Sequence, residues 1–171
     1  MENFTNETID TTQLPKFEEV VFSKLHAAYW NIILIRIAIL FILLGTGCAL
    51  VITSADEVVP FQWHLIVSVV SVTLLVLFFS RIAYHKKGFA FREHDVLFRY
   101  GVIATYTLVI PYNRIQHVAL HEGMISRIFG LAEIEIFTAG GNSSDIEIPG
   151  IERQQAENIK QLLMGRIQKE L

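Results

Sequence analysis

Four side chains in the C-terminal half of the chain are of types that could ligate a metal ion: His94, His117, His121 and Glu122. His117 and His121 share one face if residues 115–122 form a strand, because side chains alternate along a strand. Residues four apart in a strand are about 13 Å apart, which is too far to chelate one ion. We therefore predict neither a metal site nor a cofactor.

Ser143 and Ser144 are the candidates for nucleophilic chemistry, because they follow the glycine pair Gly140-Gly141. A serine nucleophile of the elbow type needs a G-x-S-x-G pattern with a positioned His and Asp. A phosphate-binding loop needs a Lys and a Ser or Thr directly after its glycines. The sequence has neither pattern. We predict that the protein is not an enzyme and that the glycine pair forms a turn.

The basic residues in the middle of the chain are candidates for contact with a membrane surface. Arg81, Lys86 and Lys87 follow a long apolar run, and each positive charge near anionic lipid contributes ~1 kcal/mol. The same residues satisfy the rule that Lys and Arg stay on the cytoplasmic side of a span. We favour this second interpretation, which needs no specific ligand.

Two apolar runs position these charges, one from Ile32 to Ile52 and one from Phe61 to Ser80. A helix needs ~20 apolar residues to cross ~30 Å of hydrocarbon. The connection between the runs is too short to hold a domain. We therefore predict an antiparallel hairpin of transmembrane helices over residues 27–84, and its spans are about 32–52 and 61–81.

The charges beside the spans predict the orientation. The loop between the spans carries Asp56 and Glu57 and no Lys or Arg, whereas Lys24 precedes the first span. Since Lys and Arg are retained in the cytoplasm, we expect both termini on the cytoplasmic side of a bacterial inner membrane.

Residues at the ends of the spans are expected to contact the membrane surface. Trp30 and Trp63 stand at the mouths of the two spans and suit the interfacial aromatic belt. Arg36 lies inside the first apolar run, where an ionisable residue is a functional candidate. Because Arg36 is near the cytoplasmic end, we favour the interpretation that its long side chain reaches the headgroups. The candidate membrane-surface contacts are Trp30, Arg36, Trp63, Arg81, Lys86 and Lys87.

Composition limits the class of protein. The chain has 171 residues, is 52% hydrophobic and carries a net charge of −3, and its mean hydropathy of +0.43 lies between soluble and polytopic proteins. The charge balance argues against nucleic acid binding, and the single Cys48 excludes an intrachain disulfide. Residues 1–26 are expected to form a cytoplasmic tail, in which residues 15–26 are either extended chain or a short amphipathic segment.

From residue 85 onward the apolar pattern alternates, which is typical of strands. The predicted strands are residues 89–91, 96–100, 102–110 with a break near Ala104, and 115–120, and two more lie around residues 134–136 and 146–148. Past Pro149-Gly150, apolar residues recur at helical spacing, which predicts one amphipathic helix that covers the sheet. The fold class is therefore an α+β membrane protein, with a two-helix hairpin followed by an antiparallel β-sandwich or partial barrel capped by a C-terminal helix.

Several ordered motifs carry a resemblance to a known family. They are Arg99-Tyr100-Gly101-Val102, the run IPYNRIQHV at residues 110–118, RIFGLA at residues 127–132, Thr138-Ala139-Gly140-Gly141 and Ile148-Pro149-Gly150. With these motifs the chain resembles the second bacterial PH-domain family, formerly a domain of unknown function, in membrane-flanked proteins of the YdbS type. The similarity covers roughly residues 25–171 and implies a cytoplasmic PH-like domain over residues 85–171.

The resemblance implies a binding or scaffolding module rather than a catalyst. It implies a partner membrane protein with related PH-like domains, or a second copy of this chain, in a complex related to envelope stress or antimicrobial-peptide resistance. A lipid-binding or lipid-handling function is the alternative. Some eukaryotic PH domains bind phosphoinositides with basic residues around the first hairpin loop, but here that loop is Glu93-His94-Asp95, whose carboxylates would repel such a headgroup.

Arg114 and Arg127 are the candidate partner or ligand contacts, because both lie inside the family-like motifs. The simpler alternative is that each arginine pairs with a carboxylate of the β-sandwich. The sequence leaves both interpretations open.

Overall fold

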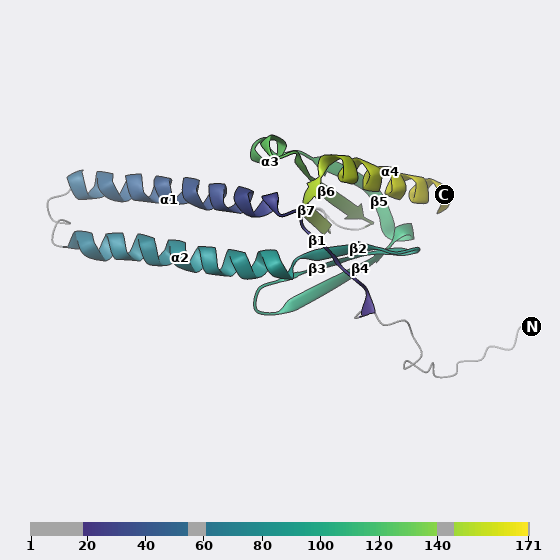
Figure 1. Cartoon of the computed structure of the whole chain (residues 1–171), viewed down its shortest axis with the longest axis horizontal. Coiled ribbons are helices and arrows are strands. Elements are labelled where there is room, and N and C mark those ends of the chain that lie inside the picture. The colour runs from purple at the N-terminus through teal and green to yellow at the C-terminus, as the bar shows by residue number, and fades with distance from the viewer. Residues whose placement is uncertain (1–18, 55–60, 140–145, 171) are drawn as a thin grey trace, which may run out of the picture.

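A computed structural model describes residues 19–54, 61–139 and 146–170. Two long helices, α1 (Ala28–Ser54) and α2 (Gln62–Lys86), extend side by side from one end of a β-domain (Figure 1). Both are long and apolar enough to cross a membrane, since an 18-residue stretch of each has a mean hydropathy of 2.5 in α1 and 2.4 in α2. Their apolar side chains are mostly exposed, whereas a core helix of a soluble protein would bury them. The predicted hairpin is confirmed.

The β-domain contains two antiparallel sheets. The first has the order β1-β2-β3-β4 and the second the order β5-β6-β7. The strands are β1 (Ser23–Lys24), β2 (Gly88–Phe91), β3 (Asp95–Gly101), β4 (Thr105–Pro111), β5 (Ile115–His121), β6 (Leu131–Thr138) and β7 (Ile146–Glu152). The helical elements of the domain are η4 (Tyr112–Arg114), α3 (Met124–Ile128) and α4 (Arg153–Glu170). The α+β class with antiparallel sheets and a C-terminal helix is therefore confirmed.

The third predicted strand begins too early. We expected it from Val102 with a break near Ala104, but β4 starts only after that break, at Thr105, because the chain turns tightly after Gly101. Gly101 has φ +134, and a Cβ there would lie 1.9 Å from the carbonyl oxygen of Ala104. Only glycine fits this turn without strain.

The segment before the hairpin belongs to the first sheet. β1 pairs antiparallel with the start of β2, and the His26 amide donates a 2.8 Å hydrogen bond to the carbonyl of Gly150 in β7. We left open whether residues 15–26 are extended chain or an amphipathic segment. The structure shows a strand at residues 23–24 and no helix over residues 20–26, which favours extended chain. Residues 1–18, which include most of the expected tail, lie outside the described residues.

One hydrophobic core joins the hairpin to the β-domain. Leu25, Tyr29 and Ile32, at and just before the start of α1, belong to the same buried cluster as the inward residues of both sheets. α4 contributes Ala156 and Leu163 to this cluster and packs on the second sheet. Because the first turns of α1 pack in this core, the helix starts at Ala28, four residues before the first predicted span at residue 32.

The antiparallel order places the connections at two ends of the domain. β2 begins directly after α2, so its start lies at the hairpin end, and each later strand reverses direction. The turn between β3 and β4, α3 and the start of α4 therefore share the hairpin end. Figure 1 shows α3 and this turn beside the turns of α1 and α2 that adjoin the β-domain. The β2–β3 loop and η4 lie at the opposite end, which we call the far end.

Candidate membrane and partner interface

An aromatic and cationic cluster ties the two helices together where they meet the β-domain. The Arg81 guanidinium carbon lies 4.7 Å from the centroid of the Trp30 ring and 5.9 Å from that of Tyr84. The rings of Trp30 and Tyr84 are 5.7 Å apart between centroids. Two of the expected membrane-surface residues thus contact each other across the hairpin, in a geometry that favours a cation–π interaction.

Lys86 and Lys87 lie where the end of α2 passes into the β-domain. The Lys86 ammonium donates a 2.5 Å hydrogen bond to the carbonyl of Val102, in the turn between β3 and β4. Burial lowers the pKa of Lys87, while the carboxylates of Glu133 and Glu147 oppose this shift. Both lysines are half-buried, and the Lys86 bond ties the β3–β4 turn to the end of α2.

The acidic face of the β6–β7 hairpin is turned toward the base of the helices. Burial raises the pKa of Glu133, and the nearby Glu147 and Glu135 raise it further, whereas His121 and Arg36 lower it. Arg36 itself is exposed on α1. Arg36 lies about two turns along α1 from Tyr29, which belongs to the core shared with the β-domain.

Trp63 stands apart from the other expected membrane-surface residues. It is exposed near the start of α2, and 18 residues of helix separate it from Arg81, a rise of ~27 Å. This separation is close to the hydrocarbon thickness of ~30 Å. The spacing of Trp63 and Arg81 thus matches the two boundaries expected for the second span.

Arg114 and Arg127 lie at opposite ends of the β-domain and cannot form one site. Arg127 belongs to α3 at the hairpin end, whereas Arg114 ends η4 at the far end. Both side chains are exposed. Over the described ranges neither arginine takes part in an ion pair with a carboxylate, so the alternative that we gave for them finds no support there.

An open groove of about 420 Å³ lies at the far end, where the first sheet ends beside the second. Its lining comes from the last residues of β4, from η4 and from the end of β6: Leu108, Val109, Ile110, Pro111, Arg114 and Thr138. Arg114 therefore lies beside an apolar strand end. This arrangement could accept an extended segment that carries an acidic group.

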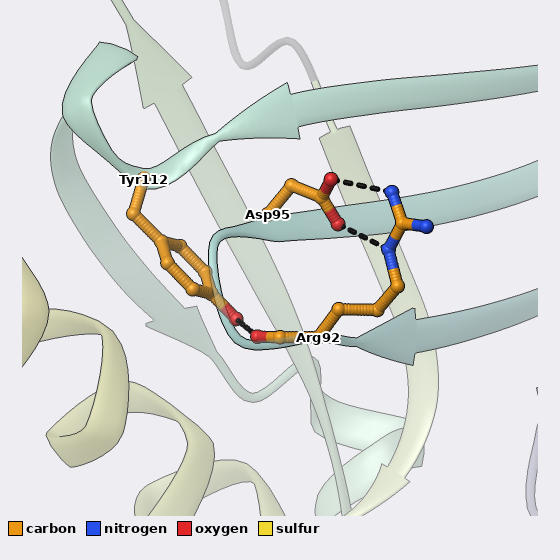
Figure 2. A network of polar contacts seen from close by, with 3 residues as sticks. All are labelled: Arg92, Asp95 and Tyr112. Carbon is orange, nitrogen blue, oxygen red and sulfur yellow. Dashed lines mark hydrogen bonds and ion pairs between the residues drawn. The ribbon is translucent and has the colours of Figure 1, made fainter. Parts of the chain in front are cut away.

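A polar network fixes the β2–β3 loop at the far end (Figure 2). Arg92 holds Asp95 through Nε–Oδ1 and Nη2–Oδ2 contacts of 2.6 and 2.5 Å. The buried Tyr112 donates a 2.6 Å hydrogen bond from its hydroxyl to the Arg92 carbonyl. These contacts tie the two ends of the loop together, and the Asp95 charge is compensated by Arg92.

Three exposed apolar residues at the hairpin end were missed by the sequence reasoning. Ile103 is 91% exposed in the β3–β4 turn, and Met124 and Ile128 are 84% and 78% exposed on α3. Two signals could have identified them. An isoleucine is unusual in a tight turn, where small polar residues dominate, and residues four apart on a helix share one face.

The residues considered for catalysis and metal binding contribute little to this geometry. His117 stacks on Phe137 with ring centroids 4.1 Å apart. Throughout the part of the chain that the structure describes, no three His, Cys, Asp or Glu side chains come close enough to hold a metal ion. Gly140-Gly141, Ser143 and Ser144 lie outside the described residues.

The comparisons with known proteins identify the family. A family model described as the bacterial PH domain matches residues 14–167. The UPF0699 transmembrane protein YdbT of Bacillus subtilis (strain 168) is 25% identical over 114 residues, which are 56% of this chain and 23% of that protein. This chain thus spans under a quarter of that relative's length. No solved structure matches this chain. Because the family model covers nearly the whole sequence, including both helices and both sheets, the chain belongs to the bacterial PH domain family.

Proposed function

We propose that this protein is a membrane-anchored PH-like module that binds and holds a protein partner at the cytoplasmic face of the bacterial inner membrane. The shared core makes the β-domain a rigid extension of the hairpin, and so the domain keeps a fixed height below the bilayer. Tethering raises the effective concentration of the domain near other membrane proteins without new contacts. Its role is binding, without catalytic turnover.

The observation that carries this proposal is the edge of β4. In the first sheet β4 pairs with β3 on one side, and the strands that the structure describes leave its other side unpaired. Tyr106 and Val109 on this strand are exposed. An open edge offers backbone donors and acceptors to an added strand, and the groove beside Arg114 offers an apolar and cationic end point.

The partner that we propose is a membrane protein with related PH-like domains. Support comes from the transmembrane relative YdbT. The similarity to this chain covers less than a quarter of the length of YdbT. Two such domains each carry sheet edges that can pair. We further propose that the complex serves resistance to envelope stress or to antimicrobial peptides, which growth of a deletion strain under each stress would test.

Site-specific photo-crosslinking in cells tests the β4 edge. A photoreactive residue at Val109 should give an adduct with a membrane protein that contains PH-like domains, and Arg114→Glu should reduce this adduct several-fold. The matched control is Leu162, an exposed apolar residue on α4, which should give no such adduct. Equal crosslinking from both positions would exclude β4 as the docking edge, and a lipid adduct at Val109 would favour the lipid-handling alternative.

The orientation is a separate part of the proposal. Both ends of the hairpin lead into the same β-domain, because β1 precedes α1 and β2 follows α2. With the positive charges at this end, we propose that both termini are cytoplasmic. Green fluorescent protein fused after residue 171 should fluoresce, and alkaline phosphatase at that position should be inactive. An inactive fluorescent protein together with an active phosphatase would show that the C-terminus lies outside the cytoplasm, and the proposed orientation would be wrong.

A further inference from the structure

The hairpin end of the β-domain exposes apolar side chains that neither the core nor the β4 edge uses. Ile103, Met124 and Ile128 are 91%, 84% and 78% exposed. Outside the two long helices, Val21 is the one other described large apolar residue with comparable exposure, at 91%. Exposed apolar area is unfavourable in water, so three such side chains at one end of the domain indicate that another surface covers them.

The hairpin fixes where the bilayer lies relative to Ile103. The charge-free run of α2 ends at Ser80, so the hydrocarbon boundary falls close to Arg81. Lys86 is five residues further along the helix, a rise of ~7.5 Å, which is comparable to the ~5–8 Å headgroup layer on each side of the hydrocarbon. Its ammonium holds the carbonyl of Val102, the residue before Ile103. The turn is therefore tied to α2 at the depth of the headgroups.

α3 lies at the same depth on the other flank of the hairpin. It contacts α1, and Figure 1 places α3 and the β3–β4 turn on opposite sides of the pair of helices. Ile125 of α3 packs against the core, which leaves Met124 and Ile128 directed outward. Arg127, between them in sequence, is exposed as well. Apolar side chains beside a cation are typical of segments that lie in the membrane interface.

We propose that Ile103, Met124 and Ile128 insert into the cytoplasmic leaflet on both sides of the hairpin, while Arg127 contacts lipid phosphates. The occupant of this surface is the bilayer, because the spans of the same chain continue directly from it. Contacts on two flanks, together with the spans, fix the tilt of the β-domain against the membrane. The domain is thus docked on lipid as well as tethered to it.

Fluorescence quenching in nanodiscs tests this docking with the full chain. Cys48→Ser removes the native thiol, and Ile103→Cys, Met124→Cys or Ile128→Cys adds one site for an environment-sensitive dye. These positions are so exposed that the substitutions should not disturb folding. Val21→Cys is the matched control, because it is equally exposed but precedes β1 on the side that leads away from the hairpin end. The nanodiscs contain phosphatidylcholine and phosphatidylglycerol.

The expected result is a blue-shifted dye at residues 103, 124 and 128, with several-fold less quenching by iodide than at residue 21. Lipids that carry a nitroxide near the headgroup should quench these three dyes strongly. Arg127→Gln should weaken the lipid quenching at residues 124 and 128 when phosphatidylglycerol is present. Iodide quenching equal to that at residue 21 would overturn the proposal. Protection from iodide without quenching by nitroxide lipid would also overturn it, because another protein chain would then cover the surface.

Discussion

Gly150 in β7 lies directly against the side chain of Tyr29 in the first turns of α1. A Cβ at residue 150 would be 2.6 Å from Cγ of Tyr29, and Gly150 also has φ +67. The Gly150 carbonyl accepts a hydrogen bond from the His26 amide. The base of the membrane hairpin is thus seated on a strand of the second sheet, so a movement of α1 must be shared by the β-domain.

This seating predicts that Gly150→Ala destabilises the protein. The added methyl group would displace Tyr29 from the core and would force an unfavourable backbone conformation, at a cost of ~1–3 kcal/mol. Thermal unfolding in mild detergent would measure the loss. Gly165→Ala in α4 is the control, since a Cβ there meets nothing within 4 Å, and it should be neutral or stabilising. Equal melting temperatures for the two variants would contradict the contact.

The segment before α1 should be as important to stability as a strand of the sheets. Leu25 is 6% exposed in the core, so Leu25→Ala should cost about 2–5 kcal/mol. Val21→Ala in the same segment should have little effect. For the same reason, residues 85–171 alone should not fold stably, because they lack β1 and Leu25. Cooperative unfolding of that fragment by circular dichroism would show that this expectation is wrong.

Tyr112→Phe should loosen the far end. The hydroxyl of Tyr112 donates to the Arg92 carbonyl, and its loss should cost about 0.5–1.5 kcal/mol. Hydrogen exchange should increase at residues 92–95 before the rest of the domain changes. Tyr106→Phe is the control, because Tyr106 is exposed on β4. Unchanged exchange in both variants would rule out a role for this hydrogen bond in holding the loop.

We predict that the stability of the fold depends on pH through the half-buried Glu133. Burial raises its pKa above the ordinary value of 4.5, so the folded state binds this proton more readily than the unfolded state does. Stability from this group is therefore present at acidic pH and is lost as pH rises through the raised pKa. Glu133→Gln should increase the melting temperature at pH 7, and the increase should shrink toward acidic pH. The same substitution at the exposed Glu152 should give no such trend.

The parts of the fold that depend on local pattern could be predicted. A charge-free run from Phe61 to Ser80 and the alternation around Phe89 each require only neighbouring residues. β1 could not be predicted, because two residues carry no periodicity and their partner strand follows the entire hairpin, with Ser23 opposite Phe89. Pairing over such a distance is decided by tertiary packing.

The candidate interface was only partly accessible from sequence for a similar reason. Motifs identified Arg114 and Arg127, but only the sequence of strand reversals places one at each end of the domain. Lys86 was expected at the membrane surface, and its bond to Val102 depends on a turn at residues where we predicted the start of a strand. Ile103 escaped notice because exposure depends on the folded surface.

β1 pairs with β2, which follows both long helices in the chain, and this sequence order also sets an order of events during translation. The ribosome releases β1 first, then both spans, and only afterwards β2. The first sheet therefore remains incomplete until the second span has left the exit tunnel and the chain has doubled back. If the spans insert as they are synthesised, membrane insertion therefore precedes closure of the β-domain, and a chain that stalls during insertion would display an unfinished sheet to proteases.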